Sequence, residues 1–363
     1  MQKIAILISD ITQSAGTERA VTNLSNSLAE ITDNQIYVVS VYSKNTDKTF
    51  YHIDHRVKVL HLGYSYDESR LKRVTIYGKL RRQIKNIIRE NGIEVILGTI
   101  HAYNILLSTL KGVKKIGCEH INYYSCPSVV RPLRKIAYKR LDHVVLLTKQ
   151  DADHYSFLNA GKVAVIPNIS SFSREEQANL IDHKIIMVGR FTSQKGYDIL
   201  VDIISDIKGR MGDWTIDIYG QGEDEKLIAK QIEMRGLQDI VRIHRPVSNI
   251  REKMMESSIY LMTSRNEGLP MVLIEAQSCG LPIVSFDCPE GPREIITNNV
   301  DGFLVQDFDK TCLGDRLVEL VENEKKRKEF GDRAFESAKR FTPDEIVNKW
   351  SNLFTNSRGM NNA

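Results

Sequence analysis

The sequence lacks several features that would place it in other classes of protein. Its 363 residues contain no apolar run that approaches the roughly 20 residues of a membrane-spanning helix. The apolar run Ile4–Ile8 near the start is too short for the core of a secretory signal peptide. The five cysteines are scattered and form no C-x-x-C pair, so neither a zinc site nor a disulfide framework is predicted. A reducing, cytoplasmic setting is expected.

Charge is unevenly distributed along the chain, although the net charge is only +4. Residues 1–168 hold 24 Lys and Arg against 14 Asp and Glu, whereas residues 169–363 hold 26 against 32. The overall composition, 42% hydrophobic and 26% charged, is that of an ordinary soluble protein long enough for about two domains. The basic first half suggests that this half meets something anionic.

Two segments of the first half are strongly basic. Residues 70–89 hold eight Lys and Arg and no acidic residue, and residues 131–140 hold five. In the first segment Leu80, Ile84, Ile87 and Ile88 fall on one helical face, with most of the bases opposite. The segments could be solvated helix faces or a footprint on an anionic membrane surface, and we expect the membrane surface. Nucleic acid is not expected, because Tyr77 and Tyr138 are too few for a stacking platform.

Strand-like apolar runs alternate with helical stretches in both halves, which predicts the α/β class with parallel sheets. A polar stretch after Asn168 has no apolar period and predicts a linker within 169–183, between domains at 1–168 and 169–341. A final amphipathic helix is expected within 342–363. The expected strands are Lys3–Ser9, Ile36–Tyr42, Val57–Leu60, Val95–Gly98, Lys115–Cys118, Val144–Thr148, Val163–Ile166, Lys184–Val188, Thr215–Tyr219, Val241–His244, Ile259–Thr263, Pro282–Phe286 and Gly302–Val305.

One stretch, Arg265–Ala276, carries the most chemical information. It follows a buried strand, Gly268 and Pro270 break that strand, and Pro270 suits the first turn of a new helix. Free N–H groups at the start of a helix form an anion site for which phosphate is the usual ligand. Glu275 could accept hydrogen bonds from a ribose diol, and Glu267 could face whatever the phosphate carries. An ordinary strand–turn–helix with two solvated glutamates would show the same pattern.

Three further loops follow predicted strands and hold candidate ligand groups. Arg190 and Lys195 share one loop and form a plausible diphosphate clamp, although they could be surface charges. Gly16 would let backbone approach a ligand, and Thr17 is expected to cap the next helix, in what could equally be a plain loop. His120 lies at the end of a strand, where α/β sheets place ligand chemistry, but a lone histidine is more often structural.

Two other motifs are weaker. Gly220-Gln221-Gly222 follows a strand but lacks the third glycine of the dinucleotide fingerprint, so we interpret it as a tight turn near the ligand and not as an NAD site. D-x-D, a spacing of two carboxylates that can hold a metal ion, occurs at Asp151–Asp153 and Asp307–Asp309. The first is expected at a helix start and the second in a turn. We expect no metal, because cationic side chains already serve the predicted phosphate site.

The segment Glu267 to Glu275 resembles the E-x7-E segment of retaining nucleotide-sugar glycosyltransferases of family GT4, which have the GT-B fold. Three other segments fall in the order of that family: Ala15–Glu18, Val188–Gly196 and Asp287–Glu294. The resemblance therefore covers nearly the whole chain. It implies two Rossmann-like domains facing across a cleft, and a last helix that crosses back to the first domain. It implies these donor-binding residues: Gly16, Thr17, Arg190, Lys195, Gly268, Leu269, Pro270, Met271, Val272 and Glu275.

The same resemblance implies an activity. His120 and Glu267 would contact the transferred sugar, and no cofactor would be needed. The expected reaction moves a hexose or N-acetylhexosamine, with retention, from a nucleotide sugar, with uridine diphosphate favoured, to a glycan. The expected acceptor is a lipid-linked intermediate of bacterial surface polysaccharide, such as O-antigen, at the inner face of the cell membrane. A sugar-nucleotide epimerase, a sugar-phosphate synthase or an inactive scaffold of the same fold remain alternatives.

Overall fold

The structure is a computed structural model that describes residues 1–65, 70–120, 123–172, 174–289, 291–306 and 308–355, without the side chains of residues 70–75 and 125. The chain divides into two compact units. Unit 1 comprises Met1–Ile169 and Pro343–Ala363, and unit 2 comprises Ser170–Thr342. The side chains of three basic residues named above are not described: Arg70, Lys72 and Arg73. Glu290, Asp307 and the last eight residues lie outside the described residues altogether.

Unit 1 is built on one parallel sheet. In its described part the sheet has seven strands in the order β3-β2-β1-β4-β5-β6-β7. Each strand lies close to one of the apolar runs of the sequence, because a strand covered on both faces is apolar throughout. The strands are β1 (Lys3–Ile8), β2 (Gln35–Ser40), β3 (Lys58–His61), β4 (Val95–Gly98), β5 (Lys114–Glu119), β6 (His143–Leu146) and β7 (Val163–Val165).

Helices cover both faces of this sheet, as the alternation of side chains along β1 requires. Ile4, Ile6 and Ile8 join one core cluster, and Ala5 and Leu7 join the other. The helices and 3-10 turns of unit 1 are α1 (Gly16–Ile31), α2 (Arg70–Asn91), α3 (His101–Leu107), η1 (Tyr123–Ser125), α4 (Arg131–Tyr138), α5 (Lys149–Asp153), η2 (Ala160–Lys162) and α13 (Pro343–Thr355).

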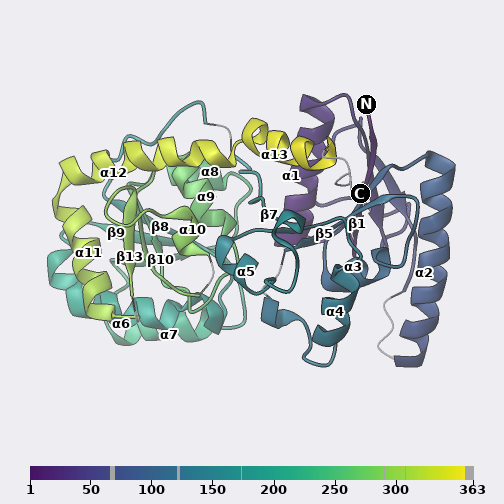
Figure 1. The fold of residues 1–363 in the computed structure, drawn as a ribbon. Coiled ribbons are helices and arrows are strands. Elements are labelled where there is room, and N and C mark those ends of the chain that lie inside the picture. Colours follow the sequence, from purple (N-terminus) through teal and green to yellow (C-terminus); the bar gives the residue numbers. More distant parts are fainter. Residues whose placement is uncertain (66–69, 121–122, 173, 290, 307, 356–363) are drawn as a thin grey trace. The chain divides into compact units, whose positions relative to one another are not determined.

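Helix α13 belongs to unit 1 although it follows unit 2 in the sequence. Its apolar face places Ile346, Val347 and Trp350 in the same core cluster as β1 and α1. Figure 1 shows α13, in yellow, beside α1. The Lys114 ammonium donates to the Leu353 carbonyl at 2.6 Å and to that of Phe354 at 3.0 Å. A cation therefore satisfies carbonyl groups in the last turn of α13, where the helix dipole is negative.

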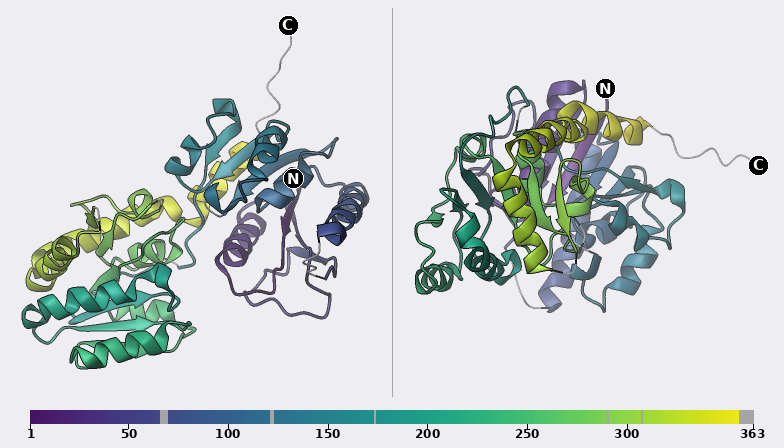
Figure 2. Two further views of the ribbon diagram at one scale, coloured as in Figure 1. Left: turned by 90° about the horizontal axis from the view of Figure 1, so that it is seen from below. Right: turned by 90° about the vertical axis from the view of Figure 1, so that its left-hand side faces the viewer.

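Unit 2 repeats the same architecture. Its sheet, in the described residues, has six parallel strands in the order β10-β9-β8-β11-β12-β13. Figure 2 shows helices on both faces of this sheet, with α6, α7 and α11 sharing one large core cluster. The strands are β8 (Lys184–Val188), β9 (Thr215–Tyr219), β10 (Val241–His244), β11 (Ile259–Met262), β12 (Ile283–Phe286) and β13 (Gly302–Val305).

The remaining elements of unit 2 connect these strands. They are η3 (Ser193–Lys195), α6 (Tyr197–Ile207), η4 (Lys208–Arg210), α7 (Glu225–Met234), α8 (Ile250–Met255), α9 (Met271–Ser278), α10 (Pro292–Ile295), α11 (Lys310–Glu322), α12 (Glu324–Ser337) and η5 (Ala338–Phe341). Two doubly wound parallel sheets with helices on both faces confirm the predicted fold class. None of the helices in the described part of the chain is long and apolar enough to cross a membrane.

The topology of unit 2 identifies where a ligand would bind. Strand β8 pairs with β9 on one side and with β11 on the other. The strand order therefore runs from β8 through β9 to β10 in one direction and from β11 through β12 to β13 in the other. Ligands of open α/β sheets bind beyond the carboxyl ends of the strands at such a switch point. The loops that follow β8 and β11 meet there, and these loops hold most of the donor-site residues predicted in unit 2.

Candidate functional site

The loop after β8 is held in shape by the loop after β11. Gly196, which ends η3, has a positive φ of 66°, and a Cβ there would lie 2.1 Å from the Thr263 carbonyl oxygen. Only glycine fits this close approach without strain. The Thr263 hydroxyl donates to the carbonyls of Lys195 and Gly196 at 3.1 and 3.0 Å. These contacts fix the direction in which Lys195 leaves the loop.

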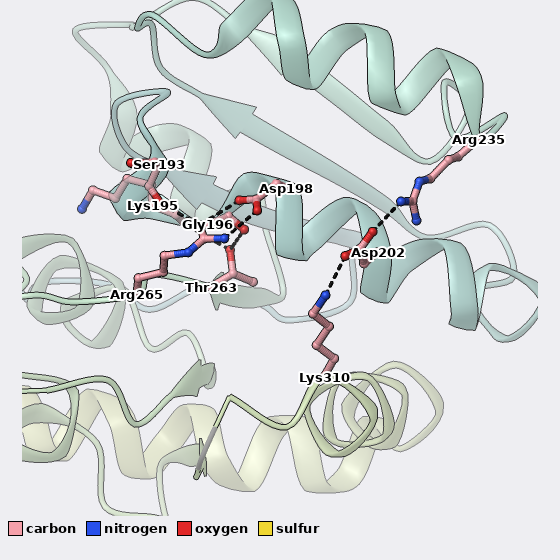
Figure 3. A network of polar contacts seen from close by, with 9 residues as sticks. All are labelled: Ser193, Lys195, Gly196, Asp198, Asp202, Arg235, Thr263, Arg265 and Lys310. Atoms are coloured by element: carbon pink, nitrogen blue, oxygen red, sulfur yellow. Dashed lines mark hydrogen bonds and ion pairs between the residues drawn. The ribbon is translucent and has the colours of Figure 1, made fainter.

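Arg265 links the loop after β11 to η3 and to the first turn of α6 (Figure 3). Its guanidinium pairs with both carboxylate oxygens of Asp198, at 2.8 and 2.6 Å, and also donates to the Ser193 carbonyl at 2.7 Å. This pairing lowers the pKa of Asp198. Bidentate arginine–carboxylate pairs impose a fixed geometry. Arg265 therefore fixes the position of η3 relative to the turn that carries Glu267.

Lys195 and Glu267, predicted separately as clamp and catalytic residue, form an ion pair. The Lys195 ammonium lies 2.6 Å from Glu267 Oε1, and the Ser264 hydroxyl donates to the same oxygen at 2.6 Å. The Glu267 side chain is 8% exposed and that of Lys195 is 20% exposed. A carboxylate with so little contact with water requires such partners. The structure thus brings a cation and an anion together at the switch point.

The loop after β12 completes this surface of unit 2. The Glu267 N–H donates to the Pro289 carbonyl at 3.4 Å. A Cβ at Gly291 would lie 1.7 Å from the Gly268 carbonyl oxygen, so only glycine permits these loops to pack. Next to them Arg293 pairs with both oxygens of Asp287 at 2.9 and 2.8 Å. Three loops, after β8, β11 and β12, therefore hold Glu267 in place.

Arg190 lies in the same loop as Lys195 but points to solvent. It is exposed, and no ion pair between described residues includes it. The loop around it is packed against Gly220 and Gly222: a Cβ at Gly220 would lie 1.9 Å from the Gly189 carbonyl oxygen, and one at Gly222 would lie 2.3 Å from that of Phe191. The two glycines of the G-x-G motif therefore allow the loop after β9 to pack closely against the loop after β8.

Helix α9 begins one residue later than predicted. Pro270 is the N-cap and Met271 is the first helical residue, because ψ of Pro270 is 101° and lies outside the helical range. Leu269 is buried, and Met271 and Val272 are partly exposed. A Cβ at Gly268 would have nothing within 4 Å among the described atoms, so internal packing does not require glycine there.

Glu275 lies in the second turn of α9 and is only 1% exposed. The predicted alternative of a solvated glutamate is therefore wrong for this residue. Contact with a ribose would require its side chain or a neighbouring side chain to move. Burying a carboxylate is costly, so its retention in a core position indicates a specific partner.

In unit 1 the structure corrects the prediction for Thr17. Helix α1 starts at Gly16 with Ala15 as its N-cap, and no side chain caps it. The helix therefore starts two residues earlier than a Thr17 cap would place it, because Gly16 and Thr17 already belong to it. Gly16 is exposed, and a Cβ there would meet no described atom within 4 Å. Thr17 is partly exposed in the first turn.

His120 follows directly after β5, at the carboxyl end predicted for it. Burial lowers the pKa of His120 to about 4, so the imidazole is neutral at pH 7. It lines a cavity of about 20 Å³ in unit 1 with Cys118, Pro167 and Trp350. A neutral imidazole can donate or accept a hydrogen bond but supplies no charge. Residues 121 and 122, which follow it, lie outside the described residues.

Glu119, the residue directly before His120, belongs to a buried polar cluster. Glu119 accepts hydrogen bonds from the Tyr138 hydroxyl and, at 3.0 Å, from the Asn104 amide, which also donates to the Cys118 carbonyl. Burial raises the pKa of Glu119 to about 7. Gly117 makes room for this amide, since a Cβ there would lie 3.0 Å from Asn104 Cγ. The end of β5 is thereby tied to α3 and α4.

The two D-x-D motifs lie at helix starts as far as they are described. Asp151 lies in the first turn of α5, and its N–H donates to the Thr148 hydroxyl at 3.0 Å. Asp309 caps α11, accepting from the Cys312 N–H at 2.9 Å. Asp307, the other half of the second motif, lies outside the described residues. Helix capping accounts for Asp309, whereas at the first motif the cap is Thr148 and not Asp151.

Comparison with known proteins identifies the family. The family described as "Glycosyl transferases group 1" matches residues 168–337. The amylovoran biosynthesis glycosyltransferase AmsD of Erwinia amylovora is 32% identical over 364 residues, covering 97% of this chain and 99% of AmsD. The chain belongs to the group 1 glycosyl transferases.

Two further comparisons cover nearly the whole chain. An alpha-1,4-N-acetyl-D-galactosaminyltransferase of Campylobacter jejuni, named for an undecaprenol-linked glycan, is 26% identical and covers 97% of this chain and 98% of its own. A solved structure of TarM from S. aureus in complex with UDP has a TM-score of 0.78 at 15% identity, covering 98% and 100%. That likeness confirms the GT-B fold, and membership of the family confirms that the chain is a glycosyltransferase.

Some site residues of this glycosyltransferase were missed in the sequence. From the sequence, Asp198 reads as an ordinary acid in the first turn of a helix and Arg265 as a surface charge. Nothing local indicates that they pair, because they are 67 residues apart. Ser264 carried no signal beyond its place at the end of a strand. The buried Glu119 cluster carried a signal that was not used: an acid directly before His120 at the end of an apolar strand.

Proposed function

We propose that this group 1 glycosyltransferase is a retaining, metal-independent enzyme of family GT4. It moves a hexose or N-acetylhexosamine from a UDP-sugar to a glycan carried by a lipid. The product is an intermediate of bacterial surface polysaccharide, such as O-antigen. The relatives support this proposal: AmsD is named for amylovoran biosynthesis, the Campylobacter enzyme for an undecaprenol-linked acceptor, and TarM was solved with UDP.

The observation that carries the proposal is the meeting of charged groups at the switch point of unit 2. Arg190 and Lys195 supply two cations after β8, and the first N–H groups of α9, those of Met271 and Val272, have no carbonyl of their own helix to pair with. Glu267 lies within 2.6 Å of Lys195. A diphosphate satisfies the cations and the helix terminus, and the sugar it carries satisfies the carboxylate. Gly268 leaves room for such a ligand.

The roles in the reaction follow from this arrangement. The bond between the anomeric carbon and the diphosphate oxygen breaks, and the electron pair leaves with the diphosphate. Arg190, Lys195 and the α9 terminus near Leu269–Val272 stabilise the charge that develops there. Glu267 holds sugar hydroxyls and stabilises the oxocarbenium-like state. The acceptor hydroxyl attacks the same face, and its proton passes to the leaving phosphate oxygen.

Other residues bind parts of the donor. Glu275 holds the ribose once its burial is relieved. In unit 1, Gly16 and Thr17 approach the diphosphate, and neutral His120 donates a hydrogen bond to the sugar. His120→Ala is expected to lower kcat about 100-fold, the scale of one positioned donor, while UDP affinity stays within about twofold. Loss of UDP affinity instead would assign His120 to nucleotide binding.

The place of the enzyme is the inner face of the cell membrane. The basic segments 70–89 and 131–140 attract it to anionic lipid, and nucleic acid is not a partner. Their described side chains fit a surface role: Leu80 and Ile84 are buried, whereas Lys79, Lys85 and Lys135 are exposed. Such attraction weakens with ionic strength, because exposed charges are screened within about 10 Å at 0.1 M salt.

Binding of UDP tests the donor site first. Thermal shift and calorimetry compare UDP, GDP and UDP-hexoses on the wild type, Arg190→Gln and Glu275→Gln, with Arg333→Gln as a matched exposed arginine on α12. A ligand specific for the native state raises the melting temperature. UDP is expected to bind the wild type and Arg333→Gln, and to bind the other two at least tenfold more weakly. No nucleotide binding to the wild type would favour an inactive scaffold.

Product analysis then separates the enzymatic alternatives. Incubation with a UDP-sugar and no acceptor should leave the sugar unaltered, whereas an epimerase would convert it. Proton NMR of the anomeric centre reports whether the configuration is retained. EDTA is expected to leave the rate unchanged, because cationic side chains hold the diphosphate. A reversible loss of activity in EDTA would contradict this assignment of the phosphate site.

A further inference from the structure

Helix α4 of unit 1 and the turn before it expose large apolar side chains to solvent. Val129 is 85% exposed, Leu133 is 53% exposed and Ile136 is 58% exposed. The intervals of four and three residues place them on one side of a helical segment. Single exposed apolar residues are common on protein surfaces, but a row of three on one short helix and the turn before it requires an explanation.

The opposite side of α4 is firmly packed, so the exposed row is not the result of a loose helix. Arg134 is fully buried, stacks over Tyr123 with its guanidinium carbon 3.9 Å from the ring centre, and donates to the Tyr123 carbonyl at 3.3 Å. Tyr138 is fully buried and donates to Glu119. The orientation of α4 is therefore fixed, and its apolar row faces outward in the folded protein.

Basic residues surround this row and acidic residues are absent from the segment. Residues 123–141 contain five Lys and Arg and no Asp or Glu. Of the five, Lys135, Lys139 and Arg140 are exposed. Apolar side chains on one face, with Lys and Arg beside them and no acid, are typical of helices that lie in the interface of an anionic bilayer.

A cavity opens along the same edge of unit 1. Its volume is about 570 Å³, and most of its lining is apolar or aromatic. Val130 and Leu133 of the α4 segment form one wall, and Ile76 and Tyr77 of α2 form another. Leu133 belongs to both the exposed row and the cavity wall. A molecule held at the exposed row therefore has direct access to the cavity.

We propose that this face of unit 1 docks on an anionic lipid bilayer, with Val129, Leu133 and Ile136 inserted among the lipids. The mouth of the cavity then lies at the bilayer surface, where it receives an amphiphilic acceptor without that acceptor leaving the lipid. This inference deepens the proposed function and rests on it only for the identity of the acceptor. It adds an apolar, salt-resistant component to the electrostatic attraction proposed above.

A second copy of the chain is a poorer occupant. A two-fold contact would bring this row onto its own image and place Lys135, Lys139 and Arg140 opposite one another. Like charges in such a contact repel each other, whereas anionic lipid head groups would attract them. Charge thus favours the bilayer.

Vesicle cosedimentation tests the proposal on the full chain. Vesicles of phosphatidylcholine alone are compared with vesicles in which phosphatidylglycerol replaces a third of the lipid, at about 0.1 M and about 0.5 M NaCl. The test variant is Val129→Ser/Leu133→Ser/Ile136→Ser, which leaves every basic residue in place. The matched control is Leu227→Ser/Met234→Ser, which removes two exposed apolar residues from α7 of unit 2.

The wild type and the α7 control are expected to bind the anionic vesicles and to keep part of that binding at high salt. The triple variant should bind at least tenfold more weakly and lose its residual binding at high salt. Equal binding by the triple variant and the wild type, or no binding by the wild type, would overturn the proposal. A wild-type dimer that the triple variant cannot form would also overturn it, by assigning the face to a second copy.

UDP binding separates this proposal from the proposed function. The melting-temperature shift with UDP should be the same in the wild type and the triple variant, which also shows that the variant folds. Vesicle binding without any UDP binding would leave the docking face standing and remove the donor site. UDP binding without vesicle binding would leave the donor site standing and remove the docking face.

Discussion

The ion pair between Lys195 and Glu267 gives the sharpest prediction about unit 2. Lys195→Met removes the ammonium and leaves the Glu267 carboxylate, whose side chain is 8% exposed, with the Ser264 hydroxyl as its remaining partner. Removing one partner of a fully buried pair costs about 3–5 kcal/mol. Lys195 is 20% exposed and Ser264 remains, so we expect a loss of about 2–3 kcal/mol in the free energy of unfolding of unit 2.

The reverse substitution should cost less. In Glu267→Gln the amide oxygen still accepts from Ser264 and from the Lys195 ammonium, and the more exposed partner keeps the charge. We expect a loss of about 1 kcal/mol. In the double variant no charge remains buried, so it should be more stable than Lys195→Met alone. The coupling energy from this cycle should be about 1–2 kcal/mol.

The two tryptophans make the assay specific to one unit. Trp214 is buried in unit 2 and Trp350 is buried in unit 1. In a Trp350→Phe background the urea-induced change in fluorescence reports unit 2 alone, and the midpoint and slope give its free energy of unfolding. If Glu267→Gln were the more destabilising change, or if both cost under about 0.5 kcal/mol, the pair would be screened like a surface salt bridge and this reasoning would be refuted.

Three further outcomes are expected. Because burial raises the folded-state pKa of Glu119 from 4.5 to about 7, this group stabilises unit 1 fully below pH 4.5, and up to about 3 kcal/mol is lost as pH rises through 7. Glu119→Gln, followed by Trp350 fluorescence in a Trp214→Phe background, should remove that loss; an unchanged pH slope would contradict the shift. Gly196→Ala should cost unit 2 at least about 2 kcal/mol in urea unfolding, because of its positive φ and the clash with Thr263; a neutral effect would show that this loop is not fixed. Arg265→Gln should weaken UDP binding by calorimetry several-fold by freeing η3, whereas Arg242→Gln, an exposed change on β10, should not.

The strands were the most predictable part of the molecule. β4, β8, β9, β10 and β13 have the predicted bounds, because short apolar runs ended by Gly, Pro or polar residues leave little choice of register in a buried parallel strand. The alternation of strands and helices then determined the class. The ends of helices were less predictable. Threonine is preferred over alanine as an N-cap because its hydroxyl can accept from a backbone N–H, yet the helix is capped by Ala15 and starts before Thr17.

The site was predicted as separate residues but not as an arrangement. Lys195 and Glu267 were both identified, but their contact spans 72 residues and depends on β8 pairing with β11, which no local pattern specifies. The link between Arg265 and Asp198 is hidden for the same reason. The burial of Glu275 also depends on packing around α9 that a sequence pattern does not contain.

The path of the chain through unit 2 has a practical consequence. Because α13 returns to unit 1, unit 2 is an insertion, and the chain enters it at Ser170 and leaves it at Thr342. The Ser170 N–H donates to the Phe341 carbonyl at 2.9 Å, so the two ends of the insertion are adjacent. Segment 170–342 is thus suited to excision, cyclisation or circular permutation. A truncation that simply stops before Pro343 would instead strip a core helix from unit 1.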